Sequence, residues 1–130
     1  EDEILLNNII NYFPKLKNLI DNQEINLYLK KVIEFSFEAN KYFNDLAPWE
    51  LKKNNPQRMN TVLYVVLNQI RSISILLYPI IPISTSKVLD AFGLDKNERQ
   101  IKSIENSSFL KPGVLIKKTD ILFKKIENDN

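Results

Sequence analysis

Apolar residues recur at steps of three or four along most of the chain, which is the spacing of one face of an α-helix. The first such run covers residues 3–20 and the second covers residues 24–45. Pro14 lies inside the first run, and we expect it to kink or split that helix, because proline lacks an N–H. The expected buried positions are Leu5, Ile9, Tyr12, Phe13, Leu16 and Leu19 in the first helix and Ile25, Leu29, Val32, Ser36, Ala39 and Phe43 in the second.

A corner and a third long helix follow. The second helix must stop by Ala47, because a residue before proline is pushed out of the α region. Residues 50–53 are predicted to add one helical turn, and the Asn54-Asn55-Pro56 segment indicates a loop. The third helix is predicted to run from residue 56 or 57 to residue 78, and apolar residues nearly surround it. Such a helix is central and packed on several sides. Its narrow polar stripe consists of Asn60, Tyr64, Asn68 and Arg71.

After the third helix, the chain is predicted to form shorter elements. Pro79 and Pro82 end the third helix, and Ser84 or Thr85 is predicted to cap a short helix that runs through Phe92. Gly93 is predicted to close that helix. Two short β-type runs, residues 114–116 and 121–123, predict a small hairpin in the tail. The fold class is therefore all-α: a helical bundle over residues 1–110 with a β-hairpin-like appendage over residues 111–130.

The composition excludes several kinds of catalytic and metal-binding site. The chain has 130 residues, which fits one domain, and it contains neither Cys nor His. Disulfides, thiolate or imidazole metal sites, and nucleophile–His pairs are therefore excluded. We predict no catalytic residue, no metal and no cofactor in this chain. The most apolar run, residues 62–83, contains Arg71 and two prolines, so we interpret it as a core helix of a cytoplasmic protein that does not enter a membrane.

Charge is distributed unevenly along the chain. The net charge is +2, with −3 on residues 1–48 and +5 on residues 49–130. This small excess does not indicate nucleic-acid binding by itself. The sequence begins Glu1-Asp2-Glu3, without an initiator Met or a signal-peptide pattern, so we expect an excerpt from a longer protein.

Three segments of the chain carry motifs in a fixed order. The first is Asn40-Lys41-Tyr42 followed by Pro48-Trp49. The second is the long helix that ends in Tyr78-Pro79-Ile80-Ile81-Pro82. The third is Leu122-Phe123-Lys124-Lys125-Ile126-Glu127. Together these segments resemble the helical anticodon-binding domain of class I aminoacyl-tRNA synthetases, over residues 24–127. The third segment is similar to the terminal Leu-Phe-Pro-Arg-Ile-Glu signature of the methionine enzyme, with Lys124 in place of proline.

The chain also departs from that family. The catalytic signatures His-Ile-Gly-His and Lys-Met-Ser-Lys-Ser are absent, so we expect no aminoacylation by this chain alone. The family's preceding helix, whose Asn and Arg contact the anticodon, has no match here. If that helix normally covers part of the bundle, its absence predicts an exposed apolar groove along the second and third helices.

The resemblance implies that Trp49 packs against an anticodon base, with Pro48 holding the indole in place. Unstacked RNA bases bind aromatic faces in this way. The alternative is that Trp49 plugs the end of the bundle and that Pro48 only terminates a helix. Asn40 is predicted either to hydrogen-bond a base edge or to bond the backbone within the bundle.

Basic residues surround the predicted corner. Lys41, Lys52, Lys53 and Arg58 are candidates for RNA backbone contacts, with ordinary solvated side chains as the alternative. The Lys117/Lys118 and Lys124/Lys125 pairs are interpreted as interface or solvent-facing. Arg71 lies on the polar stripe of a buried helix. We expect a structural ion pair, for which Glu34 and Glu38 are the candidate partners, with an RNA contact as the alternative.

The predicted function is recognition of the anticodon stem-loop of methionine tRNA, as a module of an enzyme that charges this tRNA with ATP and methionine. The predicted partners are that tRNA and the enzyme's own catalytic domain. One alternative is the anticodon domain of another class I synthetase. Another is a helical protein-interaction module, which predicts no RNA affinity. A metal-free hydrolase is disfavoured, because no nucleophile–base pair is visible.

Overall fold

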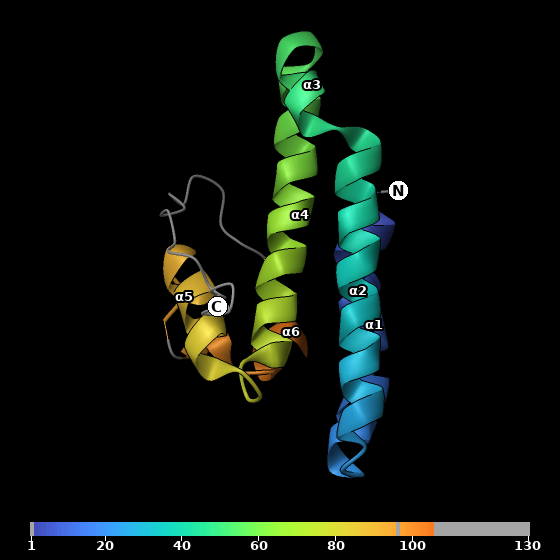
Figure 1. Ribbon diagram of the computed structural model, residues 1–130, viewed down its shortest axis with the longest axis vertical. Coiled ribbons are helices and arrows are strands. Elements are labelled where there is room, and N and C mark those ends of the chain that lie inside the picture. Colours follow the sequence, from blue (N-terminus) through green and yellow to red (C-terminus); the bar gives the residue numbers. More distant parts are fainter. Residues whose placement is uncertain (1, 96, 106–130) are drawn as a thin grey trace, which may run out of the picture.

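The computed structural model describes residues 2–95 and 97–105. This part of the chain is a helical bundle, so the predicted all-α class is confirmed (Figure 1). The predicted hairpin and the boundary at residue 110 lie outside the described residues. The elements are α1 (Asp2–Asp21), α2 (Ile25–Leu46), α3 (Pro48–Asn54), α4 (Pro56–Leu77), α5 (Pro82–Ala91), the 3₁₀ turn η1 (Asn97–Arg99) and α6 (Lys102–Glu105).

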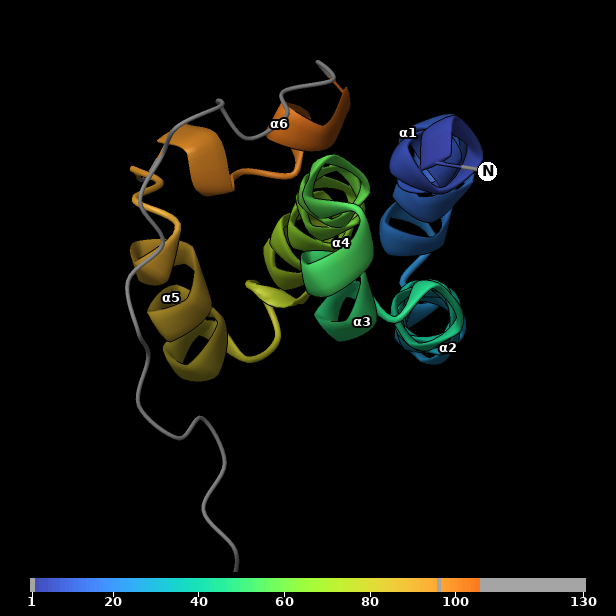
Figure 2. The same ribbon diagram turned by 90° about the horizontal axis from the view of Figure 1, so that it is seen from above.

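The central helix is α4, which contacts α1, α2, α3 and α5. Viewed along the long axis, α1 and α2 lie on one side of α4 and α5 lies on the other, with α6 beside α1 and α4 (Figure 2). The prediction of a helix packed on several sides is confirmed. Side chains from five helices share the main core cluster, which includes Ile9, Leu16, Val32, Ile75, Leu76, Leu89 and Ile104.

By length and composition alone, α4 could also cross a membrane. Half of its most apolar window is buried inside the protein. It also contains the buried polar side chains of Asn68, Gln69 and Arg71. The Gln69 amide donates a hydrogen bond of 2.7 Å to the carbonyl of Leu5 in α1. A helix that packs on four neighbours and buries polar side chains within the bundle is interpreted as a core helix of this domain.

Two expectations for the first helices were wrong. Pro14 does not split α1, which continues to Asp21. The proline is exposed, while its neighbours Phe13 and Leu16 are buried in the core, so packing maintains the helix across it. In α2 the predicted positions Val32 and Ala39 are buried, but Ile25 is exposed, so the buried face is rotated from the predicted one. The face towards α1 and α4 consists of Tyr28, Val32, Phe35, Ala39 and Tyr42.

The prediction for α5 is wrong at the start of the helix and confirmed at its end. Neither Ser84 nor Thr85 caps α5, because Pro82 takes the first helical position and the helix begins there. Thr85 is instead buried within the helix and donates a hydrogen bond of 2.8 Å to the carbonyl of Ile81. The predicted closure at Gly93 is confirmed by its φ of 72°, a left-handed conformation that glycine adopts without strain.

The start of α1 is fixed to the start of α4. Arg58 makes two hydrogen bonds to the carboxylate of Asp2, and the Tyr42 hydroxyl of α2 donates another at 2.6 Å. These hydrogen bonds lower the pKa of Asp2 from 3.8 to about 2, because they stabilise its charged form. One carboxylate thus joins three helices at the end of the bundle that also carries α3.

The polar stripe of α4 does not form the ion pair predicted for it. Glu34 bonds to Lys31, and Glu38 accepts a hydrogen bond from Asn8. The predicted pairing of Arg71 with Glu34 or Glu38 is therefore wrong. Both glutamates lie on α2 at positions directed towards α1 or solvent, whereas Arg71 is buried on α4.

Candidate functional site

A sharp corner joins α2 to α3. Ala47 has φ 44° and ψ 66°, so it is left-handed, and its N–H bonds back to the carbonyl of Phe43 at 3.1 Å. This conformation costs a non-glycine residue about 1 kcal/mol. Pro48 follows at the first position of α3, where its missing N–H leaves no helical bond unmade. The sequence therefore ends one helix and begins the next within a single residue.

Trp49 lies directly after this corner and is 54% exposed. Its ring packs against Phe43, with centroids 5.5 Å apart and planes tilted by 60°. Pro48, its neighbour in the chain, is buried. The alternative, in which Trp49 plugs the end of the bundle, predicts a more buried side chain than this one. An indole held on one side and open to solvent on the other is a surface on which a planar base can stack.

An apolar groove of about 370 Å³ runs between α2 and α4. The groove predicted along these two helices is therefore present. Phe43 lines its wall and also touches Trp49, so the groove and the indole are adjacent. Asn40 lines the same wall and is exposed, which leaves its amide accessible to a ligand. The other lining residues are Ser36, Ala39, Val66, Ile70, Ile73 and Ser74.

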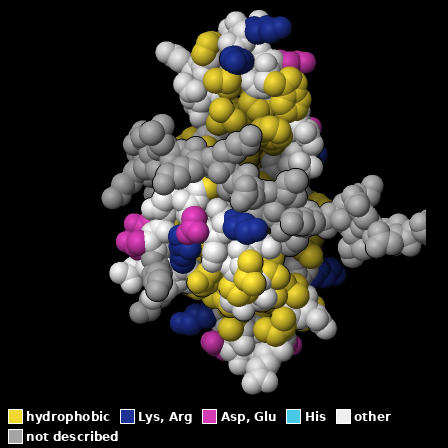
Figure 3. Space-filling model, turned by 60° about the vertical axis from the view of Figure 1, so that its left-hand side comes forward, with side chains coloured by type: hydrophobic (Ala, Val, Ile, Leu, Met, Phe, Trp, Pro, Cys, Tyr) yellow, Lys and Arg dark blue, Asp and Glu magenta, His cyan; other side chains and the backbone are white. Residues whose placement is uncertain are grey.

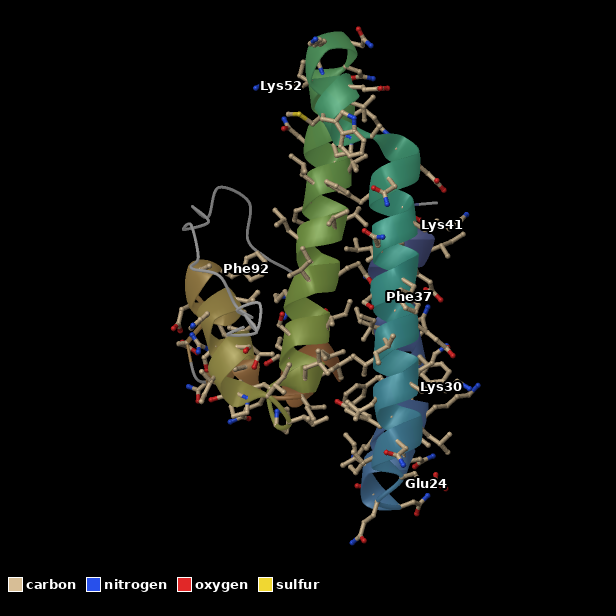
Figure 4. All side chains as sticks on the ribbon, in the orientation of Figure 1. Glu24, Lys30, Phe37, Lys41, Lys52 and Phe92 are labelled. Atoms are coloured by element: carbon tan, nitrogen blue, oxygen red, sulfur yellow. The ribbon has the colours of Figure 1, made fainter. Side chains whose placement is uncertain are left out.

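The predicted basic residues do not form one cluster. Lys52 and Lys53 are exposed in the last turn of α3, and Figure 3 shows basic side chains at that tip above an apolar patch. Lys52 and Lys41 point in different directions in Figure 4. Lys41 is 80% exposed and lies 3.4 Å from Asp45 on its own helix. Arg58 is held in the ion pair with Asp2.

The structure therefore brings Pro48, Trp49, Lys52 and Lys53 to one end of the bundle, with Asn40 further down the groove. The sequence interpretation missed the role of Phe43, which was assigned only to the buried stripe of α2. Its position six residues before Trp49, across a helix break, was the available signal, but only the fold shows that the two rings meet. Within residues 2–95 and 97–105, no three side chains of metal-ligand type form a cluster.

Comparisons with known proteins agree with this geometry. Residues 1–130 match the family described as the anticodon binding domain of methionyl tRNA ligase. The methionine–tRNA ligase of Rickettsia felis is 41% identical over 111 residues, which are 85% of this chain and 22% of that protein. The enzyme of Sulfolobus acidocaldarius is 32% identical over 127 residues, which are 98% of this chain and 22% of that protein.

Solved structures show the same fold. The free-state methionyl-tRNA synthetase of Mycobacterium tuberculosis superposes with a TM-score of 0.89 at 27% identity, over 98% of this chain and 26% of that chain. A second structure from that organism, bound by methionyl-adenylate, gives a TM-score of 0.87 at 28% identity, over 95% of this chain and 25% of that chain. The chain thus spans about a fifth of the length of its curated relatives.

Proposed function

Because this chain belongs to the family of anticodon-binding domains of methionyl-tRNA ligases, we propose that it recognises the anticodon stem-loop of methionine tRNA. The family match favours the methionine enzyme over the other class I synthetases. The longer enzyme would use ATP to join methionine to this tRNA. Its catalytic domain would be the second partner of the domain.

The observation that carries the proposal is the half-exposed Trp49 packed on Phe43. Anticodon bases are unpaired, so they can leave the loop and stack on an aromatic face. Stacking of one base on such a face contributes about 1–3 kcal/mol. Phe43 and buried Pro48 fix the indole before RNA arrives, so little of this free energy is lost in ordering the side chain.

Base identity requires hydrogen bonds, because stacking accepts any base. Asn40 lines the groove beside Phe43 and offers both a donor and an acceptor to a base edge. Lys52 and Lys53 lie on the same short helix as Trp49 and would contact phosphates. Such contacts add affinity without sequence information, and they weaken as the salt concentration rises because counterion release then contributes less.

Intrinsic fluorescence tests the proposal directly, because Trp49 is the only Trp in the chain. The full chain would be titrated at low salt with an RNA stem-loop that carries the methionine anticodon CAU and with one that carries a scrambled anticodon. We expect stronger quenching by the CAU loop. Equal quenching by both loops would contradict base recognition, and no response from a folded sample would favour the protein-interaction alternative.

Matched variants separate stacking from phosphate contacts. In an anisotropy assay with labelled CAU stem-loop, Trp49→Ala should weaken binding by roughly 5-fold to 150-fold, as expected for loss of about 1–3 kcal/mol. Trp49→Phe should retain part of the affinity. Ile83→Ala is the control, because Ile83 is 78% exposed on α5, away from the corner. Equal losses for Trp49→Ala and Ile83→Ala would contradict the assignment.

Salt dependence tests the lysines. The double variant Lys52→Ala/Lys53→Ala should weaken binding to both loops equally. It should also reduce the slope of log affinity against log salt by about 1 for each phosphate that a lysine no longer neutralises. Lys87→Ala, an exposed lysine on α5, is the matched control. An unchanged slope in the double variant would show that these lysines are only solvated.

A further inference from the structure

Arg71 is a buried charged residue that the proposed function leaves unused. It lies on the central helix α4, and only 3% of the residue is exposed. Among the described residues, none provides a hydrogen-bond acceptor for its Nε. Guanidinium groups are rarely buried in this way without a carboxylate or several acceptors around them, because removing the charge from water is costly. Arg71 therefore lacks the negatively charged partner that its burial requires.

Glu98, in η1, is the described carboxylate that acts on Arg71. Burial lowers the pKa of Arg71, and the charge of Glu98 opposes this shift because it favours the charged guanidinium. Glu98 is exposed, and none of the ion pairs within the described residues uses it. Glu34 and Glu38 instead have partners on α2 and α1. Glu98 thus combines an exposed carboxylate with an electrostatic effect on the buried charge.

The segment that contains η1 packs near the end of α4 that carries Arg71. Leu94 precedes η1 and Ile101 follows it, and both pack against the main core cluster. That cluster includes Ile75, which lies one helical turn after Arg71 on the same side of α4. Figure 2 shows α6, which follows η1, beside α4. The core therefore holds both ends of the segment close to the buried guanidinium.

Hydrogen bonds fix the backbone of η1 within this segment. The Asp95 carboxylate accepts hydrogen bonds from the N–H groups of Asn97 and Glu98, at 3.0 and 3.1 Å. The Arg99 guanidinium donates to the Leu94 carbonyl, with 3.1 Å between Nε and the oxygen. These hydrogen bonds involve main-chain groups of the segment and leave the Glu98 side chain able to rotate. The turn is thus anchored, and its exposed acid can change direction without unfolding it.

We propose that Glu98 is the counter-ion of Arg71, and that its side chain closes onto the guanidinium as a strap between η1 and the central helix. Closure gives Nε an acceptor and places a negative charge beside the buried positive one. It also adds a direct polar contact to the apolar packing that holds the segment between α5 and α6 against the core. The strap is independent of RNA binding, because Trp49 lies at the other end of α4.

A double-mutant cycle in the full chain tests this pairing. Arg71→Met, Glu98→Ala and the double variant would be compared with the wild type by urea unfolding, followed by circular dichroism at pH 7. Glu98→Ala should raise the unfolding equilibrium constant by about 5-fold or more, because it leaves Arg71 buried without a counter-ion. In the Arg71→Met background, the same substitution should change that constant by less than about 2-fold.

Glu24→Ala is the matched control, because Glu24 is an exposed glutamate at the start of α2 (Figure 4). Its effect on stability should be the same in the wild-type and Arg71→Met backgrounds. The coupling between two substitutions decides the outcome, since Arg71→Met changes packing as well as charge. Equal effects of Glu98→Ala in the two backgrounds would overturn the proposal.

A second measurement requires no substitution of Arg71. The chain contains three arginines, Arg58, Arg71 and Arg99, so ¹⁵N-arginine labelling gives three Nε–Hε signals. Arg58→Lys and Arg99→Lys identify two of these signals, and the third belongs to Arg71. Glu98→Ala should shift the Arg71 signal and accelerate its hydrogen exchange, while the Arg58 signal stays unchanged. An Arg71 signal with the same shift and exchange rate in the wild type, Glu98→Ala and Glu24→Ala would show that Glu98 is not its partner.

Discussion

Tyr28→Phe tests how the bundle closes at the end of α4. Tyr28 is 2% exposed, and its hydroxyl donates a hydrogen bond of 2.6 Å to the carbonyl of Leu76. That carbonyl lies in the last turn of α4, where the carbonyl groups lack a backbone N–H partner within the helix. The N–H of Ile80, four residues further on, bonds to Leu77 instead. A side chain from α2 therefore satisfies a group that the helix leaves unpaired.

The expected loss follows from these contacts. Phenylalanine keeps the ring and its packing, so no large cavity forms. The substitution removes one hydrogen bond and leaves a buried carbonyl without a donor, which costs about 1–3 kcal/mol. For a domain of this size, 2 kcal/mol corresponds to a decrease of roughly 8 °C in Tm. Urea unfolding followed by circular dichroism would measure the free energy of unfolding directly.

The same hydroxyl predicts a pH dependence. Burial raises the pKa of Tyr28 from 10.0 to about 12, because the ionised phenolate loses its solvation. The folded protein thus keeps a proton that the unfolded chain releases, so this contribution is complete below pH 10 and is lost as the pH rises towards 12. A shift of two units corresponds to about 3 kcal/mol. Tyr28→Phe should lose less stability than the wild-type chain over this range.

Tyr12→Phe is the matched control. Tyr12 lies on α1, where its ring packs edge-on against Phe35 and beneath two lysines, and these contacts use the ring and not the hydroxyl. Its stability should therefore change by less than about 0.5 kcal/mol. If Tyr28→Phe lowers the free energy of unfolding no more than Tyr12→Phe at pH 7, the Leu76 carbonyl has another donor. The predicted role of the Tyr28 hydroxyl is then wrong.

Three further predictions concern stability. Asp2→Asn should lower the free energy of unfolding by about 1 kcal/mol at pH 7, because the ion pair with Arg58 lies near the surface. The greater stability of the wild-type chain should disappear as the pH falls from about 4 to 2. A stability difference that persists at pH 2 would contradict this prediction. Gly93→Ala should lower Tm, because alanine in this left-handed backbone conformation costs about 1 kcal/mol. No steric clash adds to this cost, since a Cβ at residue 93 meets nothing within 4 Å. An unchanged Tm in calorimetry would contradict the prediction. Arg99→Met removes the donors to the Leu94 carbonyl and should accelerate hydrogen exchange around η1, with exchange in α2 as the internal reference.

The local sequence determined most of the helices. Helical spacing of apolar residues predicted all three long helices, because each needs one face that can be buried. Proline and glycine set several boundaries through their own backbone limits, as at Pro48, Pro56 and Gly93. These effects act within a few residues, so they are readable without knowledge of the fold.

The sequence also located the candidate site, but through resemblance more than through spacing. Pro48 and Trp49 form a corner in any interpretation of the chain, yet nothing local says whether the indole is buried or open. Only the packing of α2 against α4 leaves Trp49 half-exposed on Phe43 and opens the groove beside Asn40. The assignment of Arg58 to RNA likewise did not anticipate its contact with Asp2, which is 56 residues away in sequence.

The tertiary structure decided which helix faces are buried, a question that the spacing of apolar residues alone leaves open. In α2 apolar residues occupy more than one face, so spacing alone did not show that Tyr28 and Phe35 would be buried and Ile25 exposed. Pro14 could remain inside α1 because core packing on both sides outweighs one missing hydrogen bond. The sequence thus determined where helices can form, through local backbone chemistry, whereas packing between distant helices decided which faces are buried and which groups remain open to a ligand.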